Sequence, residues 1–457
     1  MDEVSPEQFV TLRPLGHVEK YSTTRSHLGI YNNVGLTARY KWSVALPASV
    51  KSTLFHALSK LIYNHPILSA VPLGIETTNP YFVRLPEICL DDIVTFVNKD
   101  LDPASPRWKE ALDKTLEEQH NRPFRFDHNK ALPFWRMLIL ETTKAPMAFT
   151  LVFVFHHALM DTKSALSLHE ELEAHMSEIN NLVSIVDPPR TINSPSCELI
   201  PPLEDLYTLH MSREFIESQE KYSEPSPDSW TGSRQTIPVT TRFESLWLSV
   251  SQTKALVALS KKEGSSVTAV LQTLIADCLF SNLPPEYNTL QADCAVSLRG
   301  FLPYPVTAAT LGCYVGSVST VYHRAPFDWH EARRTKAVIN HAMAQKGGDM
   351  AVGYLRFIEN QHHWMMGKLG RKRMAAFELS NVGVGSPLRK ESCFEVEDML
   401  FSQSSSACSA AIKISAVTGR DGQLALGFTW QEGVVDDELI GLVSLHLKNA
   451  CDPARWK

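Results

Sequence analysis

The sequence predicts a mixed α/β protein built from two domains of similar layout. The chain has 457 residues, whereas one domain usually has about 100–200, so two domains are expected. In the first half, helical patterns alternate with short apolar runs that are typical of strands. A stretch rich in proline and serine separates this half from a second one, in which a leucine-rich helix again precedes strands. No register of sequence identity between the halves proves a duplication.

Apolar periodicity and turn residues define the elements of the first half. Helices are predicted over 47–64, 107–119 and 162–179, and strands over 67–71, 81–85, 134–140 and 148–155. The first helix ends at His65-Pro66, because proline disfavours helical geometry in the residue before it. The strand over 148–155 is rich in aromatic and β-branched residues, as buried strands are, and it leads directly into His156-His157. Asp161 then stands at the turn from this strand to the third helix.

A change in composition marks the boundary between the halves. From Asp187 to Thr236 the chain is rich in proline, serine and charge and shows little periodicity. The second half is predicted to contain a strand over 243–250, a helix over 251–262 and a long apolar helix from its cap at 264–266 through 280. We therefore predict an N-terminal domain over 1–186, a linker or crossover over 187–240 and a C-terminal domain over 241–457.

Composition excludes several classes of protein. Lys and Arg number 44 against 50 Asp and Glu, a formal charge of −6 with a pI of about 6.3, which leaves no broad basic surface for nucleic acid. The eight cysteines lie far apart without a C-x-x-C pair and are predicted to be reduced thiols. The N-terminal residues lack a secretion signal, and no run of about 18 apolar residues could span a bilayer. We expect a soluble, cytoplasmic protein, with peripheral association with an intracellular membrane left open.

Three interpretations of His156 and His157 are open from the residues alone. The pair could consist of hydrogen-bonded polar residues at a strand end, which is the commonest role of such a pair. It could bind a metal, but the nearby His169 and His175 fall on different helix faces and form no H-E-x-x-H motif, so no metal site is predicted. One histidine could instead act as a general base that takes a proton from an alcohol or an amine.

The run His156-His157-x-x-x-Asp161 resembles the signature of the acyltransferase superfamily that contains chloramphenicol acetyltransferase, plant acyl-CoA alcohol acyltransferases and peptide condensation domains. Arg299, followed by the segment 311–316, resembles the arginine and the glycine-aromatic segment in the second half of these proteins. Further segments resemble the fungal alcohol O-acetyltransferase branch and cover nearly the whole chain: Arg13-Pro14-Leu15-Gly16 with Glu19 and Tyr21, Arg25-x-His27-Leu28-Gly29, 201–205, 379–383 and 430–433. Thr162 departs from the pattern, because the family usually has glycine there, the residue that a turn with positive φ favours.

The resemblance implies two similar chloramphenicol acetyltransferase-like domains with mixed sheets and a tunnel between them. In similar enzymes the second histidine faces the tunnel, so His157 would be the general base and His156 a supporting neighbour. Asp161 would be structural and would pair with an arginine; Arg25 and Arg299 are the candidates, and Arg25 is preferred. A neutral base must present a bare nitrogen to the hydroxyl while its other nitrogen donates, commonly to a backbone carbonyl.

Substrate-binding candidates follow from the chemistry that the resemblance implies. Attack of a hydroxyl on a thioester creates an oxyanion that needs a donor in a dry site, and Ser380, Asn381 and Tyr314 are the candidates. A basic cluster could bind the phosphates of coenzyme A or could equally be a solvated helix face: Lys368, Arg371, Lys372 and Arg373. The sequence has no Gly-x-Ser-x-Gly elbow and no cysteine adjacent to a histidine, so it does not support an acyl-enzyme.

The predicted function is an acetyl-CoA-dependent O-acetyltransferase for a small, mostly apolar alcohol, such as a fungal specialised metabolite, acting through a ternary complex. Acetyl-CoA is the expected co-substrate, without a metal, and we expect a monomer. Transfer to an amine or of a longer acyl chain uses the same parts and remains open. A condensation-type domain supplied by a carrier protein is disfavoured by a chain that looks free-standing, and a non-catalytic binding protein is disfavoured by the intact His157.

Overall fold

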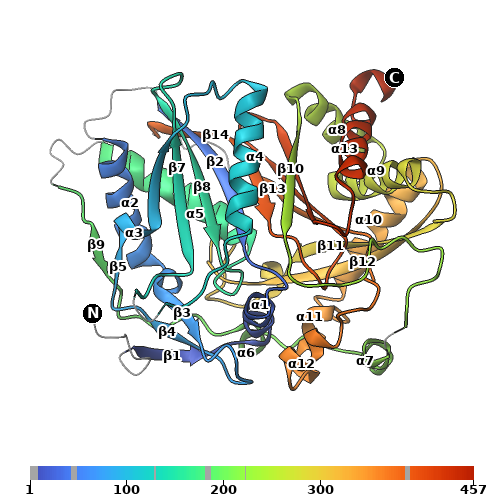
Figure 1. Ribbon diagram of the computed structural model, residues 1–457, viewed down its shortest axis with the longest axis horizontal. Coiled ribbons are helices and arrows are strands. Elements are labelled where there is room, and N and C mark those ends of the chain that lie inside the picture. The colour runs from blue at the N-terminus through green and yellow to red at the C-terminus, as the bar shows by residue number, and fades with distance from the viewer. Residues whose placement is uncertain are drawn as a thin grey trace.

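Two mixed sheets form the framework, the five-stranded one on the left of Figure 1 and the six-stranded one on the right. The computed structural model describes residues 9–42, 49–127, 130–180, 187–221, 223–385 and 392–456. In hydrogen-bonded order, the five-stranded sheet contains β14 (Phe394–Gln403), β2 (Val34–Trp42), β8 (Ala148–Phe155), β7 (Trp135–Glu141) and β6 (Val94–Asn98). The six-stranded sheet contains β10 (Thr241–Leu248), β16 (Leu424–Gln431), β15 (Ile412–Thr418), β13 (Phe377–Val384), β11 (Thr289–Ser297) and β12 (Val315–His323). Two small sheets contain β1 (Val10–Pro14), β4 (Tyr81–Arg84) and β3 (Ala70–Leu73), and β5 (Glu87–Cys89) and β9 (Thr191–Asn193).

Helices cover both sheets (Figure 1). They are α1 (His17–His27), α2 (Val50–Asn64), α3 (Leu90–Ile93), α4 (Pro106–His120), α5 (Thr162–Asn180), α6 (Leu203–Leu206), α7 (Arg213–Glu220), α8 (Val250–Lys262), α9 (Val267–Asn282), α10 (Trp329–Ala344), α11 (Ala351–Tyr354), α12 (Gln361–Met366) and α13 (Asp437–Ala450). In the first half α5 packs against α2, β2 and β14, and in the second α9 packs against α10, α13 and β13. None of the described helices could cross a bilayer alone; α8 and α9 meet that criterion only as a pair bent by 105°.

The helices and strands predicted from periodicity are confirmed, with one exception; residues 47–48, at the start of the first predicted helix, lie outside the described residues. The predicted strand over 67–71 begins instead with a 3-10 turn, Pro66–Ser69, and only then becomes β3. Proline fixes φ at a value that suits a turn, which explains the later start. The proline-rich segment after residue 187 contains short elements, namely β9, α6 and α7.

β8, which leads to the histidine pair, is buried from Phe149 through Phe155. It lies between β2 and β7 and pairs antiparallel with both, so Phe155 faces Val34 on one side and Trp135 on the other. A continuous apolar sequence is what a central strand with both faces covered requires. Pairing on both sides fixes the register of the strand and therefore the position of the residues that follow it.

The two large sheets meet at β14, which comes from the second half of the chain but pairs antiparallel with β2 of the first. It also contacts β15 and β16 of the six-stranded sheet. Gly427 of β16 permits this approach, because a Cβ there would lie 2.5 Å from the carbonyl oxygen of Phe401 in β14. The side chain of Gln403, at the end of β14, donates to the Ser415 hydroxyl of β15 at 3.0 Å. The two sheets are thus joined through backbone contact and side-chain hydrogen bonds.

Candidate active site

His157 follows β8 with one ring nitrogen bonded to the backbone. The ladder between β8 and β7 continues through the bond from the His156 N–H to the Phe134 carbonyl, and the turn beyond it brings His157 Nδ1 to 3.1 Å from the Met160 carbonyl oxygen. A carbonyl oxygen only accepts, so Nδ1 carries the proton and Nε2 is the bare nitrogen. Nε2 has no hydrogen-bond partner among the described residues, and the ring lines a cavity. The imidazole is therefore in the tautomer that a base needs.

The surroundings of His157 keep it neutral. Burial lowers the pKa of His157 to about 4; the positive charge of Arg25 lowers it as well, while the Asp161 carboxylate acts in the opposite direction. At neutral pH the ring is therefore unprotonated at Nε2 and able to accept a proton.

His156 is held by the fold and faces a different cavity. Its Nδ1 accepts a hydrogen bond from the Ala158 N–H at 3.1 Å, and its ring lies 5.5 Å from that of Phe134. It lines a cavity of about 380 Å³ whose wall does not include His157. Burial lowers the pKa of His156 to about 3. The two adjacent histidines thus point to different places, and only His157 reaches the cavity shared by both halves.

Asp161 forms a buried ion pair with Arg299, rather than with Arg25, which the sequence favoured. The Arg299 Nη1 and Nη2 atoms donate to the two carboxylate oxygens at 2.7 and 3.0 Å, and both side chains are under 10% exposed, at 6% for Arg299 and 8% for Asp161. The backbone N–H groups of Tyr314 and Ser164 also donate to the carboxylate, each at 3.0 Å. Burial raises the pKa of Asp161, but Arg299 and these donors outweigh it and hold the pKa below its ordinary value.

The same ion pair connects the two halves behind His157. Arg299 Nη2 donates to the Gly312 carbonyl at 3.1 Å, and the Asp161 N–H donates to the same carbonyl at 3.1 Å. Thr162, where the sequence resemblance predicts glycine, is the first residue of α5 and does not have a positive φ. The turn therefore tolerates threonine without backbone strain. In this geometry the Asp161 carboxylate oxygens are directed at Arg299 and at backbone N–H groups.

The cavity that His157 lines has a volume of about 370 Å³ and takes its wall from both halves of the chain. Its lining includes Tyr21, Arg25 and Tyr31 from the first half, and Ser380, Phe401 and Lys413 from the second. The Arg25 guanidinium carbon lies 4.2 Å from the centroid of the Tyr21 ring and 4.4 Å from that of Tyr31. Tyr31 in turn lies 6.2 Å, ring to ring, from His157.

Ser380 and Asn381 both line this cavity, but they differ in their hydrogen bonding. Asn381 lies where the register between β13 and β15 shifts; its Nδ2 donates to the Thr268 hydroxyl at 3.1 Å, and its Oδ1 accepts from the Gly383 N–H at 2.9 Å. The Ser380 hydroxyl makes no hydrogen bond within the part of the chain that the structure describes. Ser380 is thus the better placed of the two to donate to a substrate oxygen.

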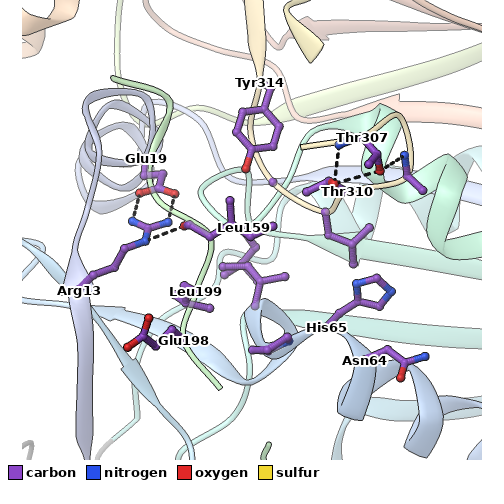
Figure 2. Close-up of a pocket in the computed structure, with 16 residues that line it drawn as sticks. Arg13, Glu19, Asn64, His65, Leu159, Glu198, Leu199, Thr307, Thr310 and Tyr314 are labelled. Atoms are coloured by element: carbon purple, nitrogen blue, oxygen red, sulfur yellow. Dashed lines mark hydrogen bonds and ion pairs between the residues drawn. The ribbon is translucent and has the colours of Figure 1, made fainter. Parts of the chain in front are cut away.

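Tyr314 does not reach the His157 cavity. Its backbone N–H binds Asp161, whereas its side chain points into a second cavity of about 260 Å³, beside the ion pair of Arg13 and Glu19 (Figure 2). Its phenol therefore lines a different cavity from the one that the neighbouring residue Cys313 lines.

The four cationic residues from Lys368 to Arg373 do not form one surface. Arg373 is buried, and its guanidinium donates to the Ser233 carbonyl and, at 3.1 Å, to Gln431 Oε1. Lys368 lines the His157 cavity with its Nζ 3.5 Å from the centroid of the Trp364 ring. Arg371 is exposed and Lys372 is half-buried. Arg373 consequently belongs to the framework and is not placed to bind a soluble phosphate.

Cys313 is a site residue that sequence reasoning missed. Its Sγ lies 3.6 Å from His157 Nδ1, although the two residues are 156 positions apart. Burial raises the pKa of the Cys313 thiol well above its usual value, and the nearby Asp161 and Glu19 carboxylates raise it further. Because the facing Nδ1 already carries a proton for Met160, it cannot take one from the thiol. The contact between Asp161 and the 312–314 segment brings this cysteine to His157.

The other histidines near the pair have partners within the fold. His169 lies between the Tyr40 hydroxyl, 2.8 Å from Nδ1, and the Leu36 carbonyl, 3.0 Å from Nε2. His175 instead approaches Glu171 on its own helix, with 3.2 Å between Nε2 and Oε1. In the described ranges no three His, Cys, Asp or Glu side chains are grouped as metal ligands.

Carboxylates at its N-terminus hold α1 in place. Arg13 donates through two nitrogens to the Glu19 carboxylate, both at 2.8 Å, and the His17 N–H at the start of α1 donates to Glu204 Oε1 at 2.7 Å. A carboxylate at a helix N-terminus satisfies an otherwise unpaired N–H and the helix dipole. Gly29 follows the helix with φ +67, a conformation that glycine adopts without strain. These contacts fix the helix that brings cationic and aromatic side chains to the cavity.

The fold occurs in solved acyltransferase structures. The TRI3 trichothecene 15-O-acetyltransferase of Fusarium sporotrichioides superposes with a TM-score of 0.71 at 12% identity, over 98% of this chain and 96% of that one. The first condensation domain of the calcium-dependent antibiotic synthetase superposes with a TM-score of 0.65 at 12% identity, over 97% and 98% of the two chains. At these identities the likeness shows the fold, which is the chloramphenicol acetyltransferase-like fold of two similar domains.

Comparison with related sequences identifies the family of this chain. A family model described as alcohol acetyltransferase matches residues 14–441. A probable alcohol acetyltransferase of Aspergillus fumigatus, crmB, is 34% identical over 446 residues, which cover 92% of this chain and 95% of that protein. A second one, FCK4 of Fusarium pseudograminearum, is 20% identical over 94% of this chain and 92% of its own. The chain is therefore an acyltransferase and belongs to the alcohol acetyltransferase family.

Proposed function

We propose that this enzyme transfers the acetyl group of acetyl-CoA to the hydroxyl of a small, mostly apolar alcohol, with His157 as the general base. One observation carries the proposal: the His157 ring bears its proton on Nδ1, bonded to Met160, and presents a bare Nε2 at a cavity lined by both halves. The family and its crmB relative support an alcohol as acceptor. The similarly folded trichothecene acetyltransferase supports a specialised metabolite as the source of that alcohol.

The proposed reaction is a direct transfer. His157 Nε2 takes the hydroxyl proton while the acceptor oxygen attacks the thioester carbonyl carbon. The tetrahedral intermediate places a negative charge on the former carbonyl oxygen, and Ser380, which lines the same cavity, is the candidate to donate to it. Collapse of the intermediate breaks the carbon–sulfur bond, and the imidazolium returns its proton to the leaving thiolate. The products are the acetate ester and free coenzyme A.

An acyl-enzyme on Cys313 is disfavoured despite the proximity of its sulfur to the histidine. A cysteine nucleophile needs a lowered pKa or a base that removes its proton. Burial raises the pKa of Cys313, and the imidazole nitrogen that faces it is the protonated one. Both substrates must therefore be bound together before transfer, in a ternary complex.

For the donor, we assign the phosphates of acetyl-CoA to the outward-facing part of the basic segment. Arg371 is exposed and Lys372 half-buried, whereas Lys368 turns toward the cavity and Arg373 into the framework. Arg is suited to phosphate because its planar fork can form two parallel hydrogen bonds. The pantetheine arm would then extend inward toward His157.

The test is acetyl transfer by purified protein from labelled acetyl-CoA to a panel of alcohols, with matched amines and longer acyl-CoA donors in parallel. His157→Ala should lower turnover by about 10²–10⁴, the usual contribution of a general base. His363→Ala, on an exposed histidine of α12, is the matched control and should leave turnover unchanged. Preference for the amines, or no transfer to any hydroxyl, would overturn the proposed function. Full activity of a folded His157→Ala protein would show that His157 is not the general base.

A further inference from the structure

Arg25 is a buried cation without a counter-ion on the wall of the His157 cavity. The residue is only 7% exposed, and its Nε is buried without a hydrogen-bond partner. No residue in the described ranges forms an ion pair with the guanidinium or accepts a hydrogen bond from it. Two tyrosine rings enclose it, at 4.2 Å for Tyr21 and 4.4 Å for Tyr31, and leave its edge with unused donors.

A second cation of the same cavity lacks a carboxylate partner as well. Lys368 stacks its Nζ on Trp364, and burial, with a contribution from the charge of Arg25, lowers the pKa of Lys368 to about 8. Buried charges are normally paired, because desolvating them alone is costly. The acidic side chains that line the cavity have other partners: Asp161 binds Arg299, Glu378 binds Lys413 and Asp293 accepts from Ser319.

The position of Arg25 indicates which anion would complete the site. Tyr31 lies against both groups, 4.4 Å from the Arg25 guanidinium carbon and 6.2 Å from the His157 ring. The guanidinium is therefore about one aromatic side chain away from the base. The phosphates of acetyl-CoA lie a full pantetheine arm from the thioester, and the acetyl group is neutral. An anion at Arg25, with the thioester at His157, must come from the acceptor.

We propose that Arg25, assisted by Lys368, binds a carboxylate of the acceptor, so that the substrate is a hydroxy acid with an apolar body. This inference rests on the proposed function, because it names the class of alcohol that His157 would acetylate. The guanidinium is positioned in advance: it is stacked between two rings, and the N–H of Ile30 donates to the Arg25 carbonyl at 2.8 Å. A guanidinium held in this way loses little conformational freedom when it binds the carboxylate. It also orients the acceptor hydroxyl toward His157 Nε2.

The first experiment measures binding without turnover, by titration calorimetry with hexanoate and with hexanol. The wild type should prefer hexanoate by about 10- to 100-fold, as expected for a charge-assisted hydrogen bond in a desolvated site. Arg25→Met should lose that preference, whereas Lys20→Met, which removes a positive charge from the same helix away from the cavity, should keep it. His157→Ala should also keep it. Melting temperatures of all variants confirm that they are folded.

The second experiment compares acetyl transfer to hydroxyhexanoate and to its methyl ester. The wild type should favour the acid through a lower KM, and in Arg25→Met the KM for the acid should rise to that for the ester. Arg25→Lys should restore part of the preference. Equal binding of hexanoate by wild type and Arg25→Met would overturn the subsite. A drop in kcat that is the same for acid and ester would also overturn it, because Arg25 would then act on the reacting group. Hexanoate binding through Arg25 without transfer to any alcohol would instead reject the proposed function and leave the subsite standing.

Discussion

Removing Arg299 should destabilise the protein strongly, because it leaves the Asp161 carboxylate charged and buried. The guanidinium supplies two short bonds to that carboxylate, at 2.7 and 3.0 Å, and the pair is 6% and 8% exposed. Breaking a buried pair from one side costs about 3–5 kcal/mol. For a chain of 457 residues that unfolds as one unit, such a loss lowers the melting temperature by on the order of 3–5 °C. Arg299→Met is the appropriate change, since methionine fills much of the vacated volume.

The double variant Asp161→Asn with Arg299→Met tests the reason for this loss. It removes both charges, so it should be more stable than Arg299→Met alone, with a coupling of about 1–3 kcal/mol in urea denaturation followed by circular dichroism. Arg333→Met breaks a pair that is half-exposed, at 3.6 Å from Glu263, and should cost less than about 1 kcal/mol. Additive effects of the two substitutions, or an Arg299→Met protein within about 1 kcal/mol of wild type, would refute the reasoning.

The pair also predicts a pH dependence with a defined sign. Arg299 and the backbone donors hold the folded-state pKa of Asp161 below its ordinary value, against the effect of burial. The stability that this contributes is fully present above the ordinary carboxyl pKa of about 4 and is lost as the pH falls through the lowered folded-state pKa. In Arg299→Met, burial is opposed only by the backbone donors, so protonation of Asp161 relieves the unpaired buried charge, and the stability difference between the variant and the wild type should shrink as the pH falls below about 4.

Three further outcomes are expected. The acid limb of the kcat/KM profile should lie near pH 4 rather than about 6.5, because burial lowers the pKa of His157 to about 4; a limb near 6.5 in folded protein would contradict a neutral buried base. Cys313→Ala should retain most of its turnover, and initial rates at varied acetyl-CoA and alcohol should intersect, whereas parallel lines or a trapped thioester would establish an acyl-enzyme. Replacing Arg371 and Lys372 by serine should raise the KM for acetyl-CoA with little change in kcat, while Arg373→Gln should lower the melting temperature instead; an unchanged KM would place the phosphates elsewhere.

Local pattern was enough to predict much of the fold. β8 and α9 are long apolar segments whose type and limits follow from composition and flanking caps, and both occur where they were expected. The pairing partner of a strand could not be predicted in this way, because pairing depends on tertiary contacts that hydrophobic periodicity does not reveal. Nothing in the sequence around Phe394–Gln403 indicates that it pairs with β2 rather than with its own half.

The site residues show the same distinction between what local sequence pattern predicts and what depends on tertiary contacts. His157 and Asp161 belong to one short motif on a strand and the turn after it, so the sequence brings them together by itself. The partner of Asp161 lies 138 positions away, and the choice between Arg299 and Arg25 depends on how the segment 310–314 folds back. Arg25, which the sequence singled out, was therefore assigned to the wrong neighbour, and Cys313 escaped notice because sequence adjacency is a poor guide to distance in space.

The crossing strand β14 has a consequence for how the chain acquires its structure during synthesis. Until Gln403 has left the ribosome, β2 has no partner on one side, and its unsatisfied N–H and C=O groups form an edge open to other chains. A fragment that ends before residue 394 would keep this edge permanently, however complete its helices are. The histidine motif is translated more than two hundred residues before β14, the strand that completes its sheet. During that interval the edge of β2 stays unpaired, and the first half can associate with other chains.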